Sequence, residues 1–263
     1  MATLEENKIV WDGKYDWPQQ GDEWSSPWGG PDMQWYGTIL PRIYSMLPRT
    51  GHTLEIACGY GRWTNYLKDL CSRLTVVDLS QECINACKQR FDGQPITYHL
   101  NDGKSLEMID DRSVDFVFSY DSLVHADQEV ITAYLSQLAR ILTTDGVAFI
   151  HHSNLGQFKS EREALGATPQ QLRDNVAAGK LDEDVHWRDP SVCAGFVEQV
   201  AHANGLKCIS QEVFCWGTVA EIDCYSTIVP VASERSRENI VFQNDDHGIE
   251  VQRLKRIREI YCE

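Results

Sequence analysis

The feature that most constrains this chain is an apolar run that stops at a glycine-rich turn, followed by a second apolar run that ends in one carboxylate. The first run and its turn occupy residues 54–61 (Leu-Glu-Ile-Ala-Cys-Gly-Tyr-Gly), and the second ends at Asp78. In a parallel α/β sheet, glycines at such a turn let the backbone approach a ligand, and the carboxylate accepts hydrogen bonds from ribose hydroxyls. The pattern predicts a site for an adenosine-containing cofactor.

The spacing of the glycines separates two classes of cofactor. A dinucleotide fingerprint needs Gly-x-Gly-x-x-Gly, whose third glycine permits close packing of helix on strand. Counted from Gly59, that third position is Thr64, which has a β-branched side chain. The sequence therefore argues against an NAD(P)-dependent oxidoreductase, which remains the alternative for a sheet of this kind.

Residues 55–61 resemble the first motif of class I S-adenosylmethionine-dependent methyltransferases, with Ala57 in place of the usual first glycine. The resemblance continues in the expected order over residues 51–230. It implies an α/β, Rossmann-like fold with a seven-stranded, mostly parallel sheet that has one antiparallel strand and is flanked by helices. It also implies S-adenosylmethionine as the cofactor and S-adenosylhomocysteine as the product.

The same resemblance implies which positions contact the cofactor. Glu55 lies near the amino group of the methionine moiety, and Asp78 binds the ribose. The sequence Asn-Asp-Gly at 101–103 approaches the adenine, although this tripeptide also forms turns in proteins generally. Tryptophans ahead of the first motif are further candidates. The predicted cofactor-binding set is Glu55, Ala57, Gly59, Gly61, Asp78, Asp102, Gly103, Tyr120, Trp28 and Trp35.

Histidines and one aspartate follow two predicted strands that are expected to be neighbours. Residues 119–125 read Ser-Tyr-Asp-Ser-Leu-Val-His, and residues 151–154 read His-His-Ser-Asn. Ligands of open α/β sheets bind at the carboxyl ends of the strands, so these side chains are expected at the cofactor crevice. A neutral imidazole there can accept a proton from an acceptor hydroxyl. The predicted catalytic set is His125 as first choice of base, then His152, with His151 and Asp121.

Other polar residues have supporting roles in this interpretation. Tyr120 and Asn154 are candidates for positioning the acceptor, and His186 and Trp187 for its wall; a purely structural role stays open for each histidine. No carboxylate pair marks the strand ends, so a metal ion is not predicted, although metal dependence stays open.

The run 118–127 together with 149–154 looks similar to methyltransferases that modify sugars and aminocyclitols. The resemblance implies transfer of a methyl group to a hydroxyl of a small molecule, a sugar or a glycosylated natural product. Methylation of an aminosugar nitrogen, or a cofactor-binding domain without activity, remain alternatives.

Charge and composition exclude several partners. The net charge is -15, with 39 acidic and 24 basic residues, so the surface repels nucleic acid backbones. No apolar run approaches the length of a membrane span, and the first residues lack the basic and apolar regions of a secretory signal. Nine cysteines without a Cys-x-x-Cys pair are expected as free thiols in a reducing compartment. These features predict a cytoplasmic protein.

The order of patterns predicts one domain in four parts. Residues 1–50 form an arm and a helix, 51–153 the cofactor-binding core, 154–190 a helical insertion over the site, and 191–263 the end of the sheet and a basic helix. The tryptophan-rich arm is expected to be irregular, acting as a lid or simply packing, and Pro41 is expected to break or kink the helix over 32–47. The terminal helix packs on the domain or on a second copy in a homodimer. Strands are expected at 52–57, 74–78, 95–100, 114–119, 146–151, 207–217 and 220–229.

Overall fold

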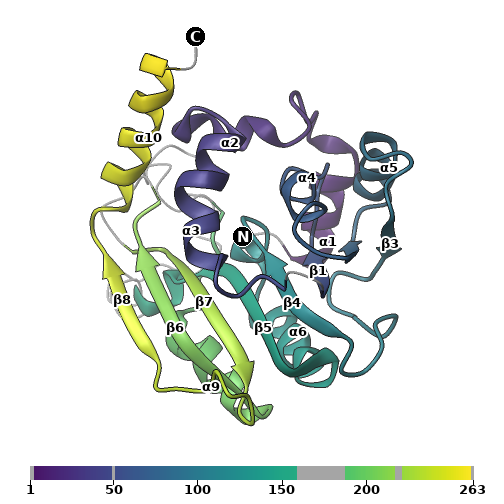
Figure 1. Cartoon of the computed structure of the whole chain (residues 1–263), viewed down its shortest axis with the longest axis vertical. Helices are drawn as coiled ribbons and strands as arrows, with labels where there is room; N and C mark the ends of the chain where they lie inside the picture. Colours follow the sequence, from purple (N-terminus) through teal and green to yellow (C-terminus); the bar gives the residue numbers. More distant parts are fainter. Residues whose placement is uncertain (1–2, 49–50, 159–186, 217–220, 262–263) are drawn as a thin grey trace.

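A mixed sheet organises the computed structural model, which describes residues 3–48, 51–158, 187–216 and 221–261. Its eight strands lie in the order β3-β2-β1-β4-β5-β7-β6-β8 (Figure 1). β7 runs antiparallel to both of its neighbours, and the remaining pairs are parallel. The strands are β1 His52–Ile56, β2 Arg73–Asp78, β3 Ile96–Leu100, β4 Val114–Ser119, β5 Leu142–Ser153, β6 Leu206–Phe214, β7 Asp223–Pro230 and β8 Ile240–Asn244.

The predicted count of seven strands was wrong by one, because no strand was expected at β8. Its residues Ile-Val-Phe-Gln-Asn show no alternation of apolar and polar side chains, and two aspartates follow directly. β8 pairs in parallel with β6, with Gln211 opposite Val241. The other seven strands overlap their expected ranges, although β5 begins at Leu142 and not at 146, and β7 is the expected antiparallel strand.

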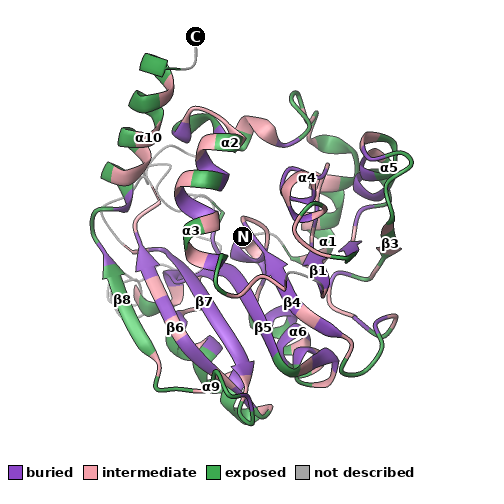
Figure 2. Ribbon diagram, in the orientation of Figure 1, coloured by how far each residue is buried: buried purple, intermediate pink, exposed green. Residues whose placement is uncertain are grey.

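Helices cover both faces of the sheet. On one face α6 (Gln128–Ile141) packs on apolar residues of the central strands, and α9 (Ala194–Ala203) packs on β6 and β7. On the other face the helical stretch from Pro31 to Ile43 packs its buried side chains, Trp35 among them, on Phe116 and Phe118 of β4. α5 (Gln81–Arg90) begins at Ser80, whose side chain accepts the N–H of Cys83 as an N-cap. The strands from β2 to β6 in sheet order are thus largely buried between two layers, while β3 is partly exposed and β8 is mostly exposed (Figure 2).

The helix around Pro41 is distorted but does not end there. It consists of α2 (Pro31–Gln34), a π-helical turn η3 (Trp35–Ile39) and α3 (Leu40–Ile43). A proline has no N–H and crowds the carbonyl one turn earlier. The wider π turn directly ahead of Pro41 is the kind of local distortion that relieves such crowding.

The arm is more regular than its composition suggests. Thr3 and Glu6 form a capping box that starts α1 (Leu4–Ile9), and η1 (Val10–Lys14) and η2 (Asp22–Trp28) follow. Most of the predicted insertion, residues 159–186, lies outside the described residues, as does His186. The remaining elements are α4 Thr64–Leu67, η4 Leu123–His125, η5 Leu155–Phe158 and α10 His247–Tyr261.

Two general expectations concern cysteines and membranes. The eight cysteines within the described residues are unpaired, and Cys262 lies outside them. Among the helices of the described residues, none has both the length and the apolar character that a bilayer crossing requires.

Candidate active site

A cavity of about 480 Å³ lies beyond the carboxyl ends of β1, β2, β3 and β4. This volume is within the range of small-molecule sites. Three stretches of chain build its wall: the loops after these strands, the N-terminal arm, and the residues around Trp187 and Trp216. The arm contributes Leu4, Asn7, Trp11, Trp17, Gly21 and Trp24.

The turn after β1 has the backbone that its glycines predict. Gly59 and Gly61 have φ of 54° and 87°, and Ala57, at the position where the family usually has glycine, also has a positive φ of 60°. A Cβ on Gly61 would lie 2.5 Å from the ring of Phe91, so this glycine permits packing on α5 and does not line the cavity. Gly59 and Ala57 do line it.

Asp78 anchors this turn to the end of β2. Its carboxylate accepts the N–H of Gly59 and the N–H of Ser80, each at 2.9 Å, and it lines the cavity. Burial raises the pKa of Asp78 to about 6. The carboxylate is therefore ionised at neutral pH and retains lone pairs for ribose hydroxyls.

Glu55 lies beneath the turn and does not line the cavity. Its carboxyl group is buried and accepts the hydroxyl proton of Thr64 at 2.5 Å. Burial raises the pKa of Glu55 to about 8, so the group is mostly protonated at neutral pH. Thr64, which occupies the third-glycine position, thus supports the turn from below.

Three further cofactor candidates do not lie in the cavity wall. Trp28 and Trp35 are core residues, 2% and 1% exposed; Trp28 donates its indole N–H to Thr38, and Trp35 stacks on Tyr66. The Asp102 side chain accepts the N–H groups of the two residues that follow Gly103, which makes it a turn residue. Gly103 itself lines the cavity, beneath Leu4 of the arm.

The arm is fixed to the cofactor loops by specific contacts. Trp17 stacks on Tyr60 of the glycine turn, with ring centroids 4.5 Å apart and planes 12° apart. Asp12 accepts the hydroxyl of Ser80 and the N–H of Glu82 at the start of α5. The arm therefore covers the cavity over the strand ends where the sequence predicted the cofactor.

His125 reaches the cavity from η4. Its Nδ1 lies 2.9 Å from the carbonyl oxygen of Trp187, and its ring is 6.1 Å from that of Trp11. Because a carbonyl only accepts, Nδ1 carries the proton and Nε2 keeps its lone pair. Burial, together with the positive charge of Arg188, lowers the pKa of His125 to about 4. The imidazole is therefore neutral at physiological pH.

His151 and His152 are fully buried, and neither lines the cavity. The Nδ1 of His151 accepts the N–H of Asp121 at 3.2 Å, and its Nε2 lies 2.9 Å from the carboxylate of Asp223. His152 bonds through Nδ1 to the Ser153 carbonyl and through Nε2 to the Ser226 hydroxyl. Both rings already use both nitrogens, which suits positioning rather than proton transfer to a ligand.

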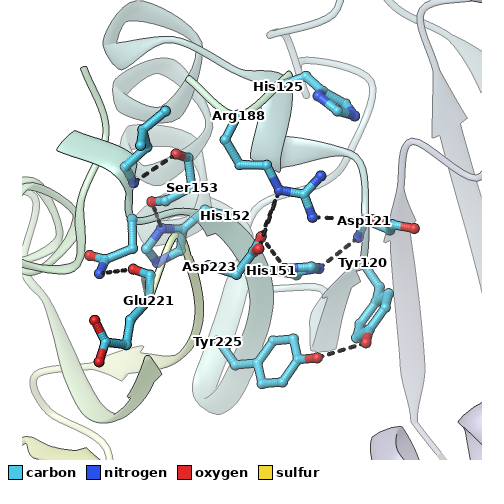
Figure 3. Close-up of polar contacts among 12 residues, drawn as sticks. Tyr120, Asp121, His125, His151, His152, Ser153, Arg188, Glu221, Asp223 and Tyr225 are labelled. Carbon is cyan, nitrogen blue, oxygen red and sulfur yellow. Dashed lines mark hydrogen bonds and ion pairs between the residues drawn. The ribbon is translucent and has the colours of Figure 1, made fainter. Parts of the chain in front are cut away.

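Asp121 belongs to a charged network in which Arg188 lies between Asp121 and Asp223 (Figure 3). Its carboxylate is 2.9 Å from Arg62 and 3.9 Å from Arg188, and the Nε of Arg188 lies 3.0 Å from Asp223. Burial alone would raise the pKa of Asp223, but Arg188 and His151 hold it below its usual value. Asp121 has a φ of 63°, and its N–H bond to His151 helps to hold this left-handed conformation.

Tyr120 and Asn154 also differ in their placement. Tyr120 lines the cavity, while its hydroxyl bonds to that of Tyr225 at 2.7 Å. Asn154 bonds to the backbone of Glu221 and Ala194 and so joins loops outside the cavity wall. Within the described residues, no three His, Cys, Asp or Glu side chains gather in an arrangement that holds a metal ion.

Sequence reasoning named as candidates only 8 of the 28 residues that line the cavity. The sequence does not indicate that Arg62 and Arg188 line the cavity, since neither residue directly follows a strand. Trp11, Trp17 and Trp24 were recognised as an unusual cluster, but the pattern does not say which ring faces the cavity.

Comparison with known proteins agrees with this geometry. The model of the methyltransferase domain family matches residues 53–146. No curated protein sequence matches the chain. Among solved structures, a magnesium protoporphyrin IX methyltransferase from Synechocystis with bound S-adenosylhomocysteine has 13% identity and a TM-score of 0.58, covering 87% of this chain and 100% of that one.

Two further structures are similar to the same extent. An S-adenosylmethionine-dependent methyltransferase from Mesorhizobium loti has 16% identity and a TM-score of 0.56, covering 76% of this chain and 99% of that one. Another from Clostridium acetobutylicum has 18% identity and a TM-score of 0.55, covering 85% of this chain and 98% of that one. At these identities the structures establish the fold.

Residues 53–146 therefore match a methyltransferase domain, and the chain has the fold of these methyltransferase structures. Two of these structures are described as S-adenosylmethionine-dependent and the third contains S-adenosylhomocysteine, the class of cofactor that the glycine spacing favours for this chain.

Proposed function

We propose that this methyltransferase transfers the methyl group to a hydroxyl of a small molecule, a sugar or a glycosylated natural product, with His125 as general base. The observation that carries the proposal is the hydrogen bond from His125 Nδ1 to the Trp187 carbonyl, because it leaves Nε2 as a proton acceptor at the cavity. Proton transfer to a positioned side chain contributes about 10²–10⁴-fold to a rate.

The cofactor half of the cavity suits an adenosine compound. We assign the methionine and ribose contacts to the backbone of Ala57 and Gly59 and to Asp78, and the adenine contact to the loop at Gly103. A Cβ on Gly59 would lie 3.1 Å from the Trp17 ring, so glycine keeps the space between turn and arm open. When bound, S-adenosylmethionine supplies an electrophilic methyl group on its sulfonium.

The acceptor half of the cavity combines aromatic rings with balanced charges. Arg62 and Arg188 are paired with Asp121 and Asp223, so this part of the wall carries no large net charge. Such a network offers hydrogen-bond donors and acceptors together, as a neutral acceptor with several hydroxyls requires. Among the rings are those of Trp24, Trp187 and Trp216, which provide apolar surface for the carbon skeleton.

The remaining catalytic candidates become positioning residues. His151 accepts the N–H of Asp121 and is itself bonded to Asp223, so it orients the backbone from which the Asp121 carboxylate projects. Exclusion of water falls to the arm, because Trp11 and Trp17 lie over the base and the glycine turn.

The direct test is a panel of sugars, aminosugars and aminocyclitols with radiolabelled S-adenosylmethionine, followed by mass spectrometry of the product. A methyl ether among the neutral sugars supports the proposal. Methylation confined to amines would support the N-methyltransferase alternative. Cofactor binding without turnover over the whole panel would favour a domain without activity.

A further inference from the structure

The edge strand β8 exposes three consecutive apolar side chains. Ile240, Val241 and Phe242 are 58%, 60% and 54% exposed. Among the described strands, β8 pairs with β6 alone, so its other edge is free, at the rim of the sheet in Figures 1 and 2. A free edge of this kind pairs readily with another strand unless charges or proline protect it. Ile-Val-Phe-Gln-Asn contains neither.

The charges beside this strand are self-complementary. Arg237 lies four residues before Val241, and Asp245 lies four residues after it. In an antiparallel pair of identical strands centred on Val241, Arg237 of each copy therefore faces Asp245 of the other. Both residues are exposed, and neither takes part in an ion pair within the described residues. The twofold symmetry produces two such pairs, one at each end of the apolar centre.

We propose that two copies of this chain associate through antiparallel pairing of β8 with β8, which joins their sheets into one continuous sheet. The partner is a second copy of the chain because the order of residues along this segment is basic, then apolar, then acidic. Such a segment is complementary to an identical one that runs in the opposite direction. Each chain carries a net charge of -15, so association needs local attraction. Val241 against Val241 and the two Arg237–Asp245 contacts supply it.

The first test measures the molar mass of the purified full chain by light scattering at about 10–100 μM, a range in which modest interfaces are populated. We expect about twice 30.0 kDa. Val241→Glu places two carboxylates opposite each other and should give a monomer that still binds S-adenosylhomocysteine. Ile257→Glu, at an exposed apolar position of α10, is the matched control and should remain a dimer. A wild-type monomer, or a dimer lost with Ile257→Glu and kept with Val241→Glu, overturns the proposal.

Charge reversal tests the register without depending on the apolar centre. Arg237→Glu and Asp245→Arg should each weaken the dimer about tenfold, because each creates two like-charge contacts. Mixing the two variants should restore association as a heterodimer, in which every contact is again between opposite charges. A variant that merely misfolds cannot be rescued in this way. Weakening by each variant without restoration on mixing would refute the antiparallel register.

Discussion

At the scale of single residues, the chemistry depends on which nitrogen of His125 faces the cavity. We expect His125→Ala to lower turnover about 10²-fold or more, since it removes the proton acceptor. Affinity for S-adenosylhomocysteine should stay within about threefold, because the cofactor contacts lie on other loops. His202→Ala, an exposed histidine on α9, is the control. Steady-state kinetics and calorimetry make the comparison, and near-normal turnover would remove His125 as the base.

Asp78 predicts a pH dependence of cofactor binding. Its pKa is raised to about 6 by burial, so the carboxylate loses its charge as the pH falls through this value. Affinity for S-adenosylhomocysteine should therefore be constant above about pH 7 and decrease by up to about tenfold per unit below pH 6. Asp78→Asn should bind more weakly at neutral pH and show a flatter profile. Calorimetry between pH 5 and 8 measures both, and equal affinities at neutral pH would mean that the ribose site lies elsewhere.

The sequence predicts strand ends better than it predicts side-chain directions. Asp78, Asp121 and His125 follow strands and line the cavity as the pattern indicated. His151 and His152 also lie at a strand end, but the antiparallel neighbour β7 covers them. The sequence shows no register between β5 and β7, so it cannot indicate that Asp223 and Ser226 occupy these two imidazoles.

At the scale of elements, the arm is the part whose role most affects kinetics. Trp17→Ala removes the ring that stacks on Tyr60 of the glycine turn. We expect S-adenosylhomocysteine to dissociate several-fold faster, because aromatic pairs of this kind contribute about 0.5–1.5 kcal/mol. Stopped-flow displacement measures this rate, with Trp28→Phe in the core as a control. An unchanged rate would mean that the arm packs without acting as a lid.

A partly buried ion pair joins α3 to the end of the sheet. Arg42 donates two hydrogen bonds to Glu212 of β6, at 2.7 and 2.6 Å, and a third to Glu250 of α10. Removing the arginine leaves a largely desolvated carboxylate uncompensated, so Arg42→Ala should lower the free energy of unfolding by about 2 kcal/mol, less than for a fully buried pair. Arg256→Ala, whose pair with Glu259 is exposed, should change it by less than about 0.5 kcal/mol. Urea denaturation of both variants gives the values.

The positions of helices and strands could be predicted where burial of one face gives the sequence a regular spacing of apolar residues. Helix α6 and the strands β1, β2 and β4 to β7 bury most of their apolar side chains, and the sequence locates them to within a few residues. β8 and α1 bury few side chains. Strand pairing determines β8 and helix capping determines α1, and neither interaction requires a regular spacing of apolar residues. The extra strand and the helical start of the arm were missed for this reason.

At the scale of the whole molecule, cofactor binding should stabilise the fold. The cavity joins the strand ends to both flanking segments, so a ligand that binds only the folded state raises the melting temperature. We expect micromolar binding of S-adenosylhomocysteine by calorimetry and a higher melting temperature at saturating concentration. NADH serves as the control and should give neither effect; the reverse result would contradict the cofactor assignment.

The wall of the cavity has two origins along the chain. Its cofactor side comes from residues 53–146, where the methyltransferase domain matches, and its cover comes from the arm and from the residues around Trp187 and Trp216. The arm contacts the glycine turn and also supplies tryptophans to the wall, so it belongs to both sides of the cavity. Grafting residues 1–28 of another methyltransferase onto this core should therefore change acceptor selectivity and cofactor affinity together. The cover of the cavity thus couples the choice of acceptor to the retention of the donor.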